Sequence, residues 1–150
     1  RLSGKVQNTL TGTDLMEKLV ACAADYGFTV GFLGGRDGVA KQSAECLQKK
    51  HPKLKVSFVY EEQGKIPASD ILFVAFGYPK QEYWIAQNLD KIPVRVAMGV
   101  GGAFDYLSGK VLRAPKWIRN LGLEWLFRLA VQPWRIKRQM ALIKYLLMLI

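Results

Sequence analysis

The sequence predicts an α/β fold: a Rossmann-like parallel sheet flanked by helices, followed by a basic helical appendage at the C-terminus. Short apolar runs alternate with stretches of helical periodicity, which is the pattern of strands joined by crossover helices. Several of these runs end in glycine. Near residue 106 tryptophan, arginine and leucine replace the alternation, so we expect a core in residues 1–105 and an appendage in residues 106–150.

Three helices are expected in the core, at Asp14–Tyr26, at Asp37–Lys50 and from Pro79 to about Leu89. The first follows an imperfect capping box, Thr13-x-x-Met16, whose Glu comes one residue late. Helical spacing turns a set of apolar and small side chains of the first two helices toward the sheet. In the first helix these are Leu15, Leu19 and Cys22, and in the second Val39, Ala40, Ser43, Ala44 and Leu47.

Four strands are expected, at Thr29–Leu33, Leu54–Tyr60, Asp70–Phe76 and Val94–Met98. The third is apolar throughout after its first residue, as a central parallel strand buried on both faces should be. Strands that alternate with helices in this way predict a parallel sheet with helices on both faces.

Composition excludes several classes of protein. The chain has 150 residues, half of them apolar and 23% charged, which is the balance of one globular domain and not of a disordered tail. Cys22 and Cys46 are too few for a disulfide scaffold, and we expect both to be small buried thiols, as in a reducing compartment. His51 is the only histidine and no Asp-x-Asp pair occurs, so no metal site is predicted.

The charge is concentrated at the C-terminus. Nine of the 22 lysines and arginines follow residue 105, where Glu124 is the only acid, so these 45 residues carry +8 of the net charge of +10. A nearly neutral core with a basic tail indicates that the tail meets a polyanion, which is a phosphate compound, a nucleic acid or an acidic membrane.

Glycines mark the ends of three expected strands, where ligands of open α/β sheets bind. Glycine lets the backbone approach an anion, and a helix N-terminus offers N–H groups and partial positive charge. Three such ends together favour a phosphate-bearing ligand over simple turns. The glycines concerned are Gly34, Gly35, Gly77, Gly99, Gly101 and Gly102.

Polar side chains accompany these glycines. Pro79 and Lys80 lead into Gln81, which offers a donor and an acceptor to a sugar or a base, and Glu82 complements the helix dipole. Asp105 follows a Gly-Gly loop, and either a bond to a ribose hydroxyl or an Asx turn accounts for it.

A dinucleotide-binding module is the alternative reading. Its fingerprint requires Gly-x-Gly-x-x-Gly, and the glycines from Gly31 to Gly38 have a different spacing. Glu61 or Glu62 would supply the acid that closes the second strand in such a fold.

Two helices are expected in the appendage, at about Leu121–Val131 and Trp134–Ile150, separated at Pro133. Arg128, Arg135 and Arg138 are seven and three residues apart, so they face roughly the same way and suit a pyrophosphate. The apolar end is too short to cross a bilayer, which takes about 20 residues, but it can lie in the interface. A core helix, or a helix that pairs copies in a homo-oligomer, is the other interpretation. Nucleic acid would explain the charge but not the apolar end.

Six motifs in series resemble the WecG/TagA/CpsF glycosyltransferases, in the same order and over essentially the whole chain. They are Thr11-Gly-Thr-Asp-Leu15, Phe32-Leu-Gly-Gly35, Phe76-Gly-Tyr-Pro-Lys-Gln-Glu82, Gly99-Val-Gly-Gly-Ala-Phe-Asp105, Arg113-Ala-Pro-Lys-Trp117 and Gly122-Leu-Glu-Trp-Leu-Phe-Arg128.

The resemblance implies a bacterial enzyme that transfers N-acetylmannosamine, or a related sugar, from UDP to N-acetylglucosamine on undecaprenyl diphosphate, with inversion. This is a step of teichoic acid or surface polysaccharide synthesis, carried out peripherally at the cytoplasmic face of the inner membrane, without a cofactor or a metal ion. Residues 1–105 then form the nucleotide-sugar-binding core, incomplete at its N-terminus, and residues 106–150 the membrane and lipid-acceptor appendage. The expected partners are the UDP-sugar, the polyprenyl-diphosphate lipid and an anionic membrane surface, and not nucleic acid.

The resemblance also assigns roles to residues. Gln81, Arg128, Arg135 and Arg138 are expected to act in catalysis, the arginines by holding the lipid diphosphate or the leaving UDP. The family's proposed base is an aspartate upstream of where this chain begins, so the chain alone is expected to bind without turnover. The expected substrate-binding residues are Gly34, Gly35, Gly77, Pro79, Lys80, Glu82, Gly99, Gly101, Gly102, Asp105 and Arg113.

Overall fold

The computed structural model describes residues 11–62, 64–133 and 136. The chain divides into two compact units, Arg1–Lys110 and Val111–Ile150. The first unit contains a sheet and helices, and the second contains helices. The elements are α1 (Gly12–Tyr26), β1 (Thr29–Gly34), α2 (Val39–Lys50), β2 (Lys55–Tyr60), β3 (Ser69–Ala75), α3 (Lys80–Asn88), the 3-10 turn η1 (Leu89–Lys91), β4 (Val94–Gly99), α4 (Ala103–Leu107), α5 (Lys116–Asn120) and α6 (Glu124–Val131).

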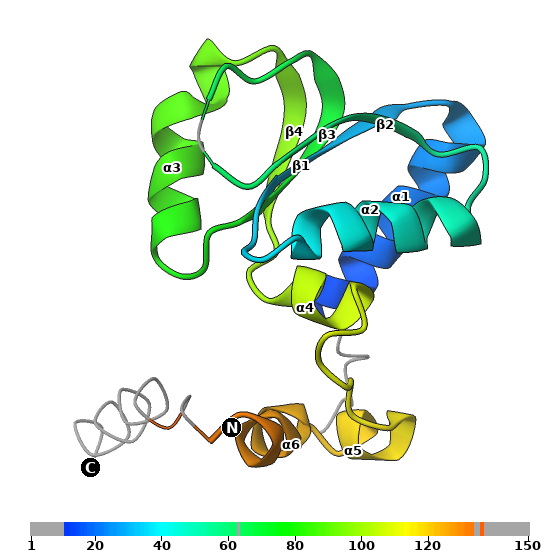
Figure 1. The fold of residues 1–150 in the computed structure, drawn as a ribbon, viewed down its shortest axis with the longest axis vertical. Coiled ribbons are helices and arrows are strands. Elements are labelled where there is room, and N and C mark those ends of the chain that lie inside the picture. Colours follow the sequence, from blue (N-terminus) through cyan, green and yellow to red (C-terminus); the bar gives the residue numbers. More distant parts are fainter. Residues whose placement is uncertain (1–10, 63, 134–135, 137–150) are drawn as a thin grey trace, which may run out of the picture. The chain divides into compact units, whose positions relative to one another are not determined.

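The sheet has four parallel strands in the order β2-β1-β3-β4, which confirms the predicted fold class (Figure 1). The chain moves outward from β1 to β2 and then returns past β1 to β3 and β4. Because parallel crossovers are right-handed, this reversal of direction puts the two sets of connections on opposite faces. The reversal between β1 and β3 is the switch point at which open α/β sheets bind ligands.

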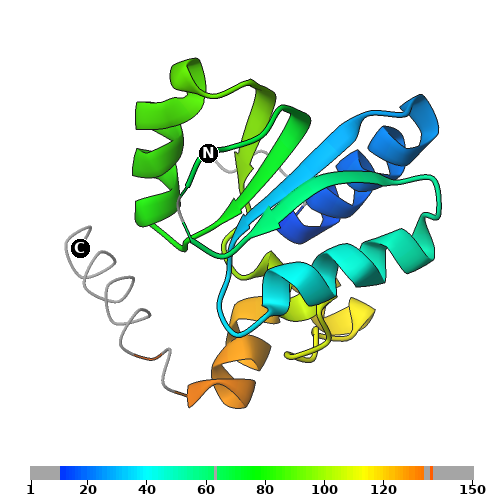
Figure 2. The same cartoon turned by 45° about the horizontal axis from the view of Figure 1, so that its top comes forward.

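The helices cover both faces of the sheet (Figure 2). On one face α1, α2 and α4 pack over Val30, Phe32, Ile71 and Phe73. On the other, Trp84 of α3 packs with the alternate side chains of the same central strands. β3 contributes to both layers and its residues 71–74 are all buried, as its continuous apolar sequence predicts.

The connection from β2 to β3 contains no helix in the residues that the structure describes. It covers the second face with Ile66, which is 5% exposed and packs with Leu33, Leu72 and Val74. One coil therefore does the covering that a crossover helix does in most parallel sheets.

α1 begins earlier than predicted, and its cap lies two residues before the expected Thr13. The side chain of Thr11 accepts a bond from the Asp14 N–H at 3.2 Å, and its hydroxyl donates to the Asp14 carboxylate at 2.7 Å. The first bond is that of an N-cap, and the second joins the two side chains, where a capping box has a bond from the carboxylate to the N-cap N–H. Asp14 therefore stabilises the start of the helix.

The structure confirms the predicted buried face of α2 but not that of α1. All five predicted residues of α2, from Val39 to Leu47, are buried, so that prediction is confirmed. The prediction for α1 is wrong by one position: Leu15 is 37% exposed, Cys22 is exposed, and Leu19 is partly buried. Met16, Val20, Ala23 and Ala24 face the sheet instead.

The expected burial of the two thiols is also corrected. Cys22 is exposed because the buried stripe of α1 is offset from it, and Cys46 is only partly buried on α2.

In the second unit the helix predicted at about Leu121–Val131 is confirmed as α6, which ends at Val131 but begins three residues later than predicted. α5 ends at Asn120, Gly122 has a left-handed backbone with φ 73°, and α6 begins at Glu124. The Leu123 N–H donates to the Ile118 carbonyl at 3.1 Å and closes the turn. The predicted helix Trp134–Ile150 lies outside the described residues except for Ile136. Among the described helices none has the length and apolarity needed to cross a membrane.

Candidate functional site at the carboxyl edge of the sheet

The carboxyl ends of β1, β3 and β4 lie side by side, as the sheet order requires. The Gly35 N–H donates to the Ala75 carbonyl at 3.1 Å, and the Val100 N–H donates to the Val74 carbonyl at 2.8 Å. We call this side of the sheet, with the loops that follow β1, β3 and β4, the carboxyl edge. It brings together the predicted glycines Gly34, Gly35, Gly77, Gly99, Gly101 and Gly102.

The glycines at the end of β1 are explained by packing. Gly34 has φ 94°, and a Cβ there would lie 2.9 Å from the Ala75 carbonyl carbon. A Cβ at Gly35 would lie 2.6 Å from Cγ2 of Val39. Neither position needs a ligand to account for its glycine. Gly77 differs, since its φ is 80° and nothing lies within 4 Å of an added Cβ.

Gln81 is a buried polar side chain at the carboxyl edge. It is only 6% exposed, and its Oε1 accepts the N–H of Gly77 at 3.2 Å and that of Gly101 at 2.9 Å. Its Nε2 donates to Oε1 of Glu82 at 2.9 Å. The carboxamide thus makes three hydrogen bonds within the protein and joins the β3–α3 loop to the β4–α4 loop.

The neighbours of Gln81 face outward. Pro79, Lys80 and Glu82 are exposed at the start of α3, which begins at Lys80. Glu82 lies in the first turn, where a carboxylate is favoured by the helix dipole. Lys80 is an exposed cation in the first turn of α3, three residues after Gly77.

Asp105 lies on α4, the short helix after the β4 loop, and is partly buried. The helix is held to α2 by the Ser43 hydroxyl, which donates to the Phe104 carbonyl at 2.9 Å. Ser108 donates to the main-chain carbonyl of Asp105 at 3.2 Å. The structure therefore places Asp105 near the end of β4, and its contact with a ribose stays a prediction.

Glu61 has a role that the sequence did not reveal. Its carboxylate accepts the N–H of Gly38 at 2.6 Å, just before α2 begins. In a dinucleotide fold a phosphate lies at the N-terminus of the corresponding helix. In this structure the Glu61 carboxylate lies at the N-terminus of α2, and its negative charge would repel a phosphate. The only signal in the sequence is that Glu61 directly follows β2, where the dinucleotide-binding alternative needs an acid.

At the opposite side, the amino edge, Asp70 joins the first residues of the central strands. Its Oδ2 accepts the Thr29 N–H at 2.8 Å and the Thr29 hydroxyl at 2.9 Å, and its Oδ1 accepts Arg95 at 3.3 Å. The backbone bond from Thr29 chiefly, then the Thr29 hydroxyl and Arg95, hold the pKa of Asp70 below its ordinary value.

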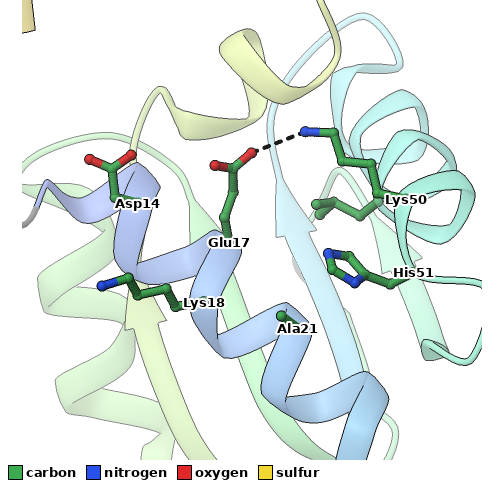
Figure 3. Close-up of a pocket in the computed structure, with 7 residues that line it drawn as sticks. Asp14, Glu17, Lys18, Ala21, Lys50 and His51 are labelled. Atoms are coloured by element: carbon green, nitrogen blue, oxygen red, sulfur yellow. Dashed lines mark hydrogen bonds and ion pairs between the residues drawn. The ribbon is translucent and has the colours of Figure 1, made fainter. Parts of the chain in front are cut away.

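An open hollow of about 570 Å³ lies between α1 and α2 (Figure 3). An ion pair of 3.2 Å between Lys50 and Glu17 spans it, and Lys18 and His51 lie at its rim. No residue of the three glycine loops lines it. Neither in the hollow nor elsewhere in the described residues do three His, Cys, Asp or Glu side chains come together as metal ligands would.

The predicted arginines lie in the second unit. Arg113 pairs with Glu124 at 3.6 Å, and both side chains are about four-fifths buried, 21% and 22% exposed. Arg128 lies on α6 and is partly buried, while Arg135 and Arg138 lie outside the described residues. Several large apolar side chains of this unit are exposed: Leu112, Trp117, Leu121, Leu123, Trp125, Leu126, Val131 and Ile136.

The chain is similar to known proteins over all or most of its length. The model of the family described as "Glycosyl transferase WecG/TagA/CpsF family" matches residues 1–150. An N-acetylglucosaminyldiphosphoundecaprenol N-acetyl-beta-D-mannosaminyltransferase of Bacillus subtilis is 33% identical over 97% of the chain and 60% of its own length. The chain thus spans about three-fifths of this relative. Because the match to the family model runs over the whole sequence, this chain belongs to the WecG/TagA/CpsF glycosyltransferase family.

Proposed function

We propose that this chain supplies the donor-binding and acceptor-binding parts of an inverting glycosyltransferase. The enzyme would transfer N-acetylmannosamine, or a related sugar, from UDP to N-acetylglucosamine on undecaprenyl diphosphate, in the synthesis of teichoic acid or another surface polysaccharide. The observation that carries the proposal is the match to a glycosyltransferase family over the whole chain. The name of the Bacillus subtilis relative supports this choice of sugar and acceptor.

The carboxyl edge is the proposed donor site. Glu61 occupies the N-terminus of α2, which supports a position for the diphosphate on the β3 and β4 side of the edge. There Lys80, which is exposed at the start of α3, is the proposed source of positive charge. A fixed cation stabilises the negative charge that develops on the leaving diphosphate as the glycosidic bond breaks. The same carboxylate of Glu61 argues against the dinucleotide-binding alternative.

The second unit is the proposed acceptor site. Arginine binds phosphate oxygens through two parallel hydrogen bonds, so Arg128, Arg135 and Arg138 suit a lipid diphosphate. The exposed apolar side chains around α5 and α6, with their tryptophans, suit the interface of an anionic membrane. These features support peripheral attachment to a membrane, and we propose from the family resemblance that it is the cytoplasmic face of the inner membrane.

The base is proposed to lie outside this chain. The family resemblance assigns it to an aspartate upstream, and Asp14 is engaged in capping α1. Transfer is proposed to need no metal ion, because the arginines and Lys80 supply the positive charge that the leaving group requires.

The test is a transfer assay with the full-length protein, UDP-N-acetylmannosamine and a short-chain lipid acceptor. We expect transfer, and for Arg128→Ala, Arg135→Ala and Arg138→Ala we expect kcat/KM to fall at least about tenfold each, since a charged hydrogen bond contributes about 1.5–3 kcal/mol. Lys49→Ala, an exposed lysine of α2, is the charge-matched control. Wild-type rates in all three arginine variants would remove the tail from the mechanism.

Calorimetry separates the proposal from its alternative. We expect the full-length protein to bind UDP and not NAD. Tight binding of NAD without binding of UDP would favour a dinucleotide-binding module that transfers no sugar.

A further inference from the structure

We propose that Gln81 is a positioning residue: it holds the β3–α3 and β4–α4 loops together as one surface for the donor and does not itself touch the donor. The inference rests on the proposed function, because it assumes that the donor binds at the carboxyl edge. It differs from the role in catalysis that the sequence predicts for Gln81.

The first step is that the carboxamide already has hydrogen-bond partners within the protein. Oε1 accepts two main-chain N–H groups, one from Gly77 and one from Gly101, and two bonds use both lone pairs of a carbonyl oxygen. Nε2 donates to Glu82. With 6% of the residue exposed, little of the carboxamide is available to a ligand.

The second step is that a glycine at the end of β4 leaves room for the side chain of Gln81. A Cβ at Gly99 would lie 2.8 Å from Nε2 and 3.1 Å from Cδ of Gln81. Gly99 has no left-handed backbone, so glycine there is explained by the close approach of this side chain. An alanine at position 99 would have to displace the carboxamide.

The third step concerns what the contact does. Gly77 and Gly101 follow different strands and share no main-chain hydrogen bond in the described residues. The oxygen of Gln81 bridges their N–H groups, so it sets the separation of the two loops. A loop held in place before binding loses less conformational freedom when the donor arrives. Loss of the contact should therefore weaken donor binding in the ground state and the transition state alike.

The main variant is Gln81→Met, which keeps the length of the side chain and removes its polar atoms. Gln87→Met, on the exposed part of the same helix, is the matched control. In full-length protein without substrate, we expect amide exchange at Gly77 and Gly101 to be about tenfold faster in Gln81→Met, the effect of about one hydrogen bond. We expect the same in Gly99→Ala and no change in Gln87→Met. Unchanged exchange in Gln81→Met would overturn the proposal.

Kinetics separate positioning from direct contact. With Gln81→Met we expect KM for the UDP-sugar to rise about tenfold while kcat stays within about threefold. A loss confined to kcat would show that the carboxamide acts on the reacting groups, and would overturn the proposal.

A pair of reciprocal variants gives the sharpest test. Gln81→Glu keeps an oxygen for Gly77 and Gly101 but sets a second carboxylate beside Glu82. In the double variant Gln81→Glu with Glu82→Gln, the donor and acceptor are exchanged and the bond can form again. We expect the amide exchange rates of Gly77 and Gly101 in the double variant to lie within about threefold of wild type, and to be faster in Gln81→Glu alone. A double variant no better than the worse single variant would overturn the proposal.

The two proposals can fail separately. If the wild-type protein neither binds UDP nor transfers sugar, the proposed function fails, and with it the role of Gln81 in donor binding. Amide exchange then still shows whether Gln81 holds the two loops, because that measurement needs no substrate.

Discussion

The two edges of the sheet are each held by one side chain, but the chemistry of the two contacts differs. At the amino edge Asp70 binds Thr29 and Arg95 with a charged carboxylate that is partly open to solvent. At the carboxyl edge Gln81 binds Gly77 and Gly101 with a neutral carboxamide that is buried. A buried carboxylate would carry a larger desolvation cost than a hydrogen-bonded amide, and its charge would repel a diphosphate, whereas the amide has no net charge. The comparison shows why a neutral group suits the edge proposed to bind an anion.

The largest loss of stability is expected from a substitution in the hydrophobic core that lies between the two edges. Phe73 is fully buried, and its ring lies 5.9 Å from that of Phe32, so Phe73→Ala removes packing from the centre of the sheet. We expect the free energy of unfolding to fall by about 3–5 kcal/mol. Urea denaturation measures it, with exposed Tyr83→Ala as the control. A loss of less than 1 kcal/mol would mean that the two edges are stabilised independently of this layer.

The next largest loss of stability should distinguish two glycines of the carboxyl edge, Gly34 and Gly77. Gly34→Ala should lose about 1–2 kcal/mol from its left-handed backbone, and the overlap with Ala75 should add about 1–3 kcal/mol. Gly77→Ala has the left-handed backbone without the overlap, so only the first loss is expected. Denaturation of both variants measures the difference. Equal losses would show that the end of β1 can relax around an added methyl group.

A pH dependence of stability is expected at the amino edge, where a carboxylate makes the contact. Because folding lowers the pKa of Asp70, its contribution to stability is complete above its ordinary value of 3.8 and is lost as the pH falls through the lower, folded value. Asp70→Asn should therefore be less stable than wild type at pH 7, and the two should converge in acid. Unfolding temperatures from pH 7 to pH 2 test this, with exposed Asp25→Asn as the control. Parallel curves for wild type and Asp70→Asn would contradict it.

The smallest effect is expected from the ion pair between Lys110 and Asp37, which lies in the loop after β1. The two atoms are 3.1 Å apart, but the side chains are 47% and 79% exposed. Lys110→Met should change the free energy of unfolding by about 0–1 kcal/mol, and less at high salt. Denaturation at low and high salt checks this, and a loss above 2 kcal/mol would mean that the loop is held far more tightly than its exposure indicates.

The sequence predicts the fold well where local pattern decides the structure. The inner face of α2 and the two-sided burial of β3 follow from periodicity alone. For α1 two stripes satisfy the helical period, one through Leu15 and Leu19 and one through Met16 and Val20. The choice between them depends on how closely the helix approaches the sheet, where the small side chains of the second stripe fit.

The candidate site is predictable only in part, for the same reason. The glycines at strand ends are visible in the sequence, and the sheet brings them to one edge. The contact between Gln81 and Gly101 joins residues twenty positions apart and depends on the pairing of β3 with β4. The capping of α2 by Glu61 depends on the path of the coil after β2. Neither contact has a local signature.

The position of Gly101 after β4 also has a consequence for the order in which the protein can assemble during synthesis. A ribosome releases the chain from its N-terminus, so β1, α2 and β2 are available to fold before β3 has emerged. When Gln81 leaves the ribosome, Gly77 has already emerged, whereas Gly101 is still inside the exit tunnel and cannot yet bind it. The nascent chain therefore completes its proposed donor site only once β4 and the loop after it are free, among the last steps of folding of the first unit.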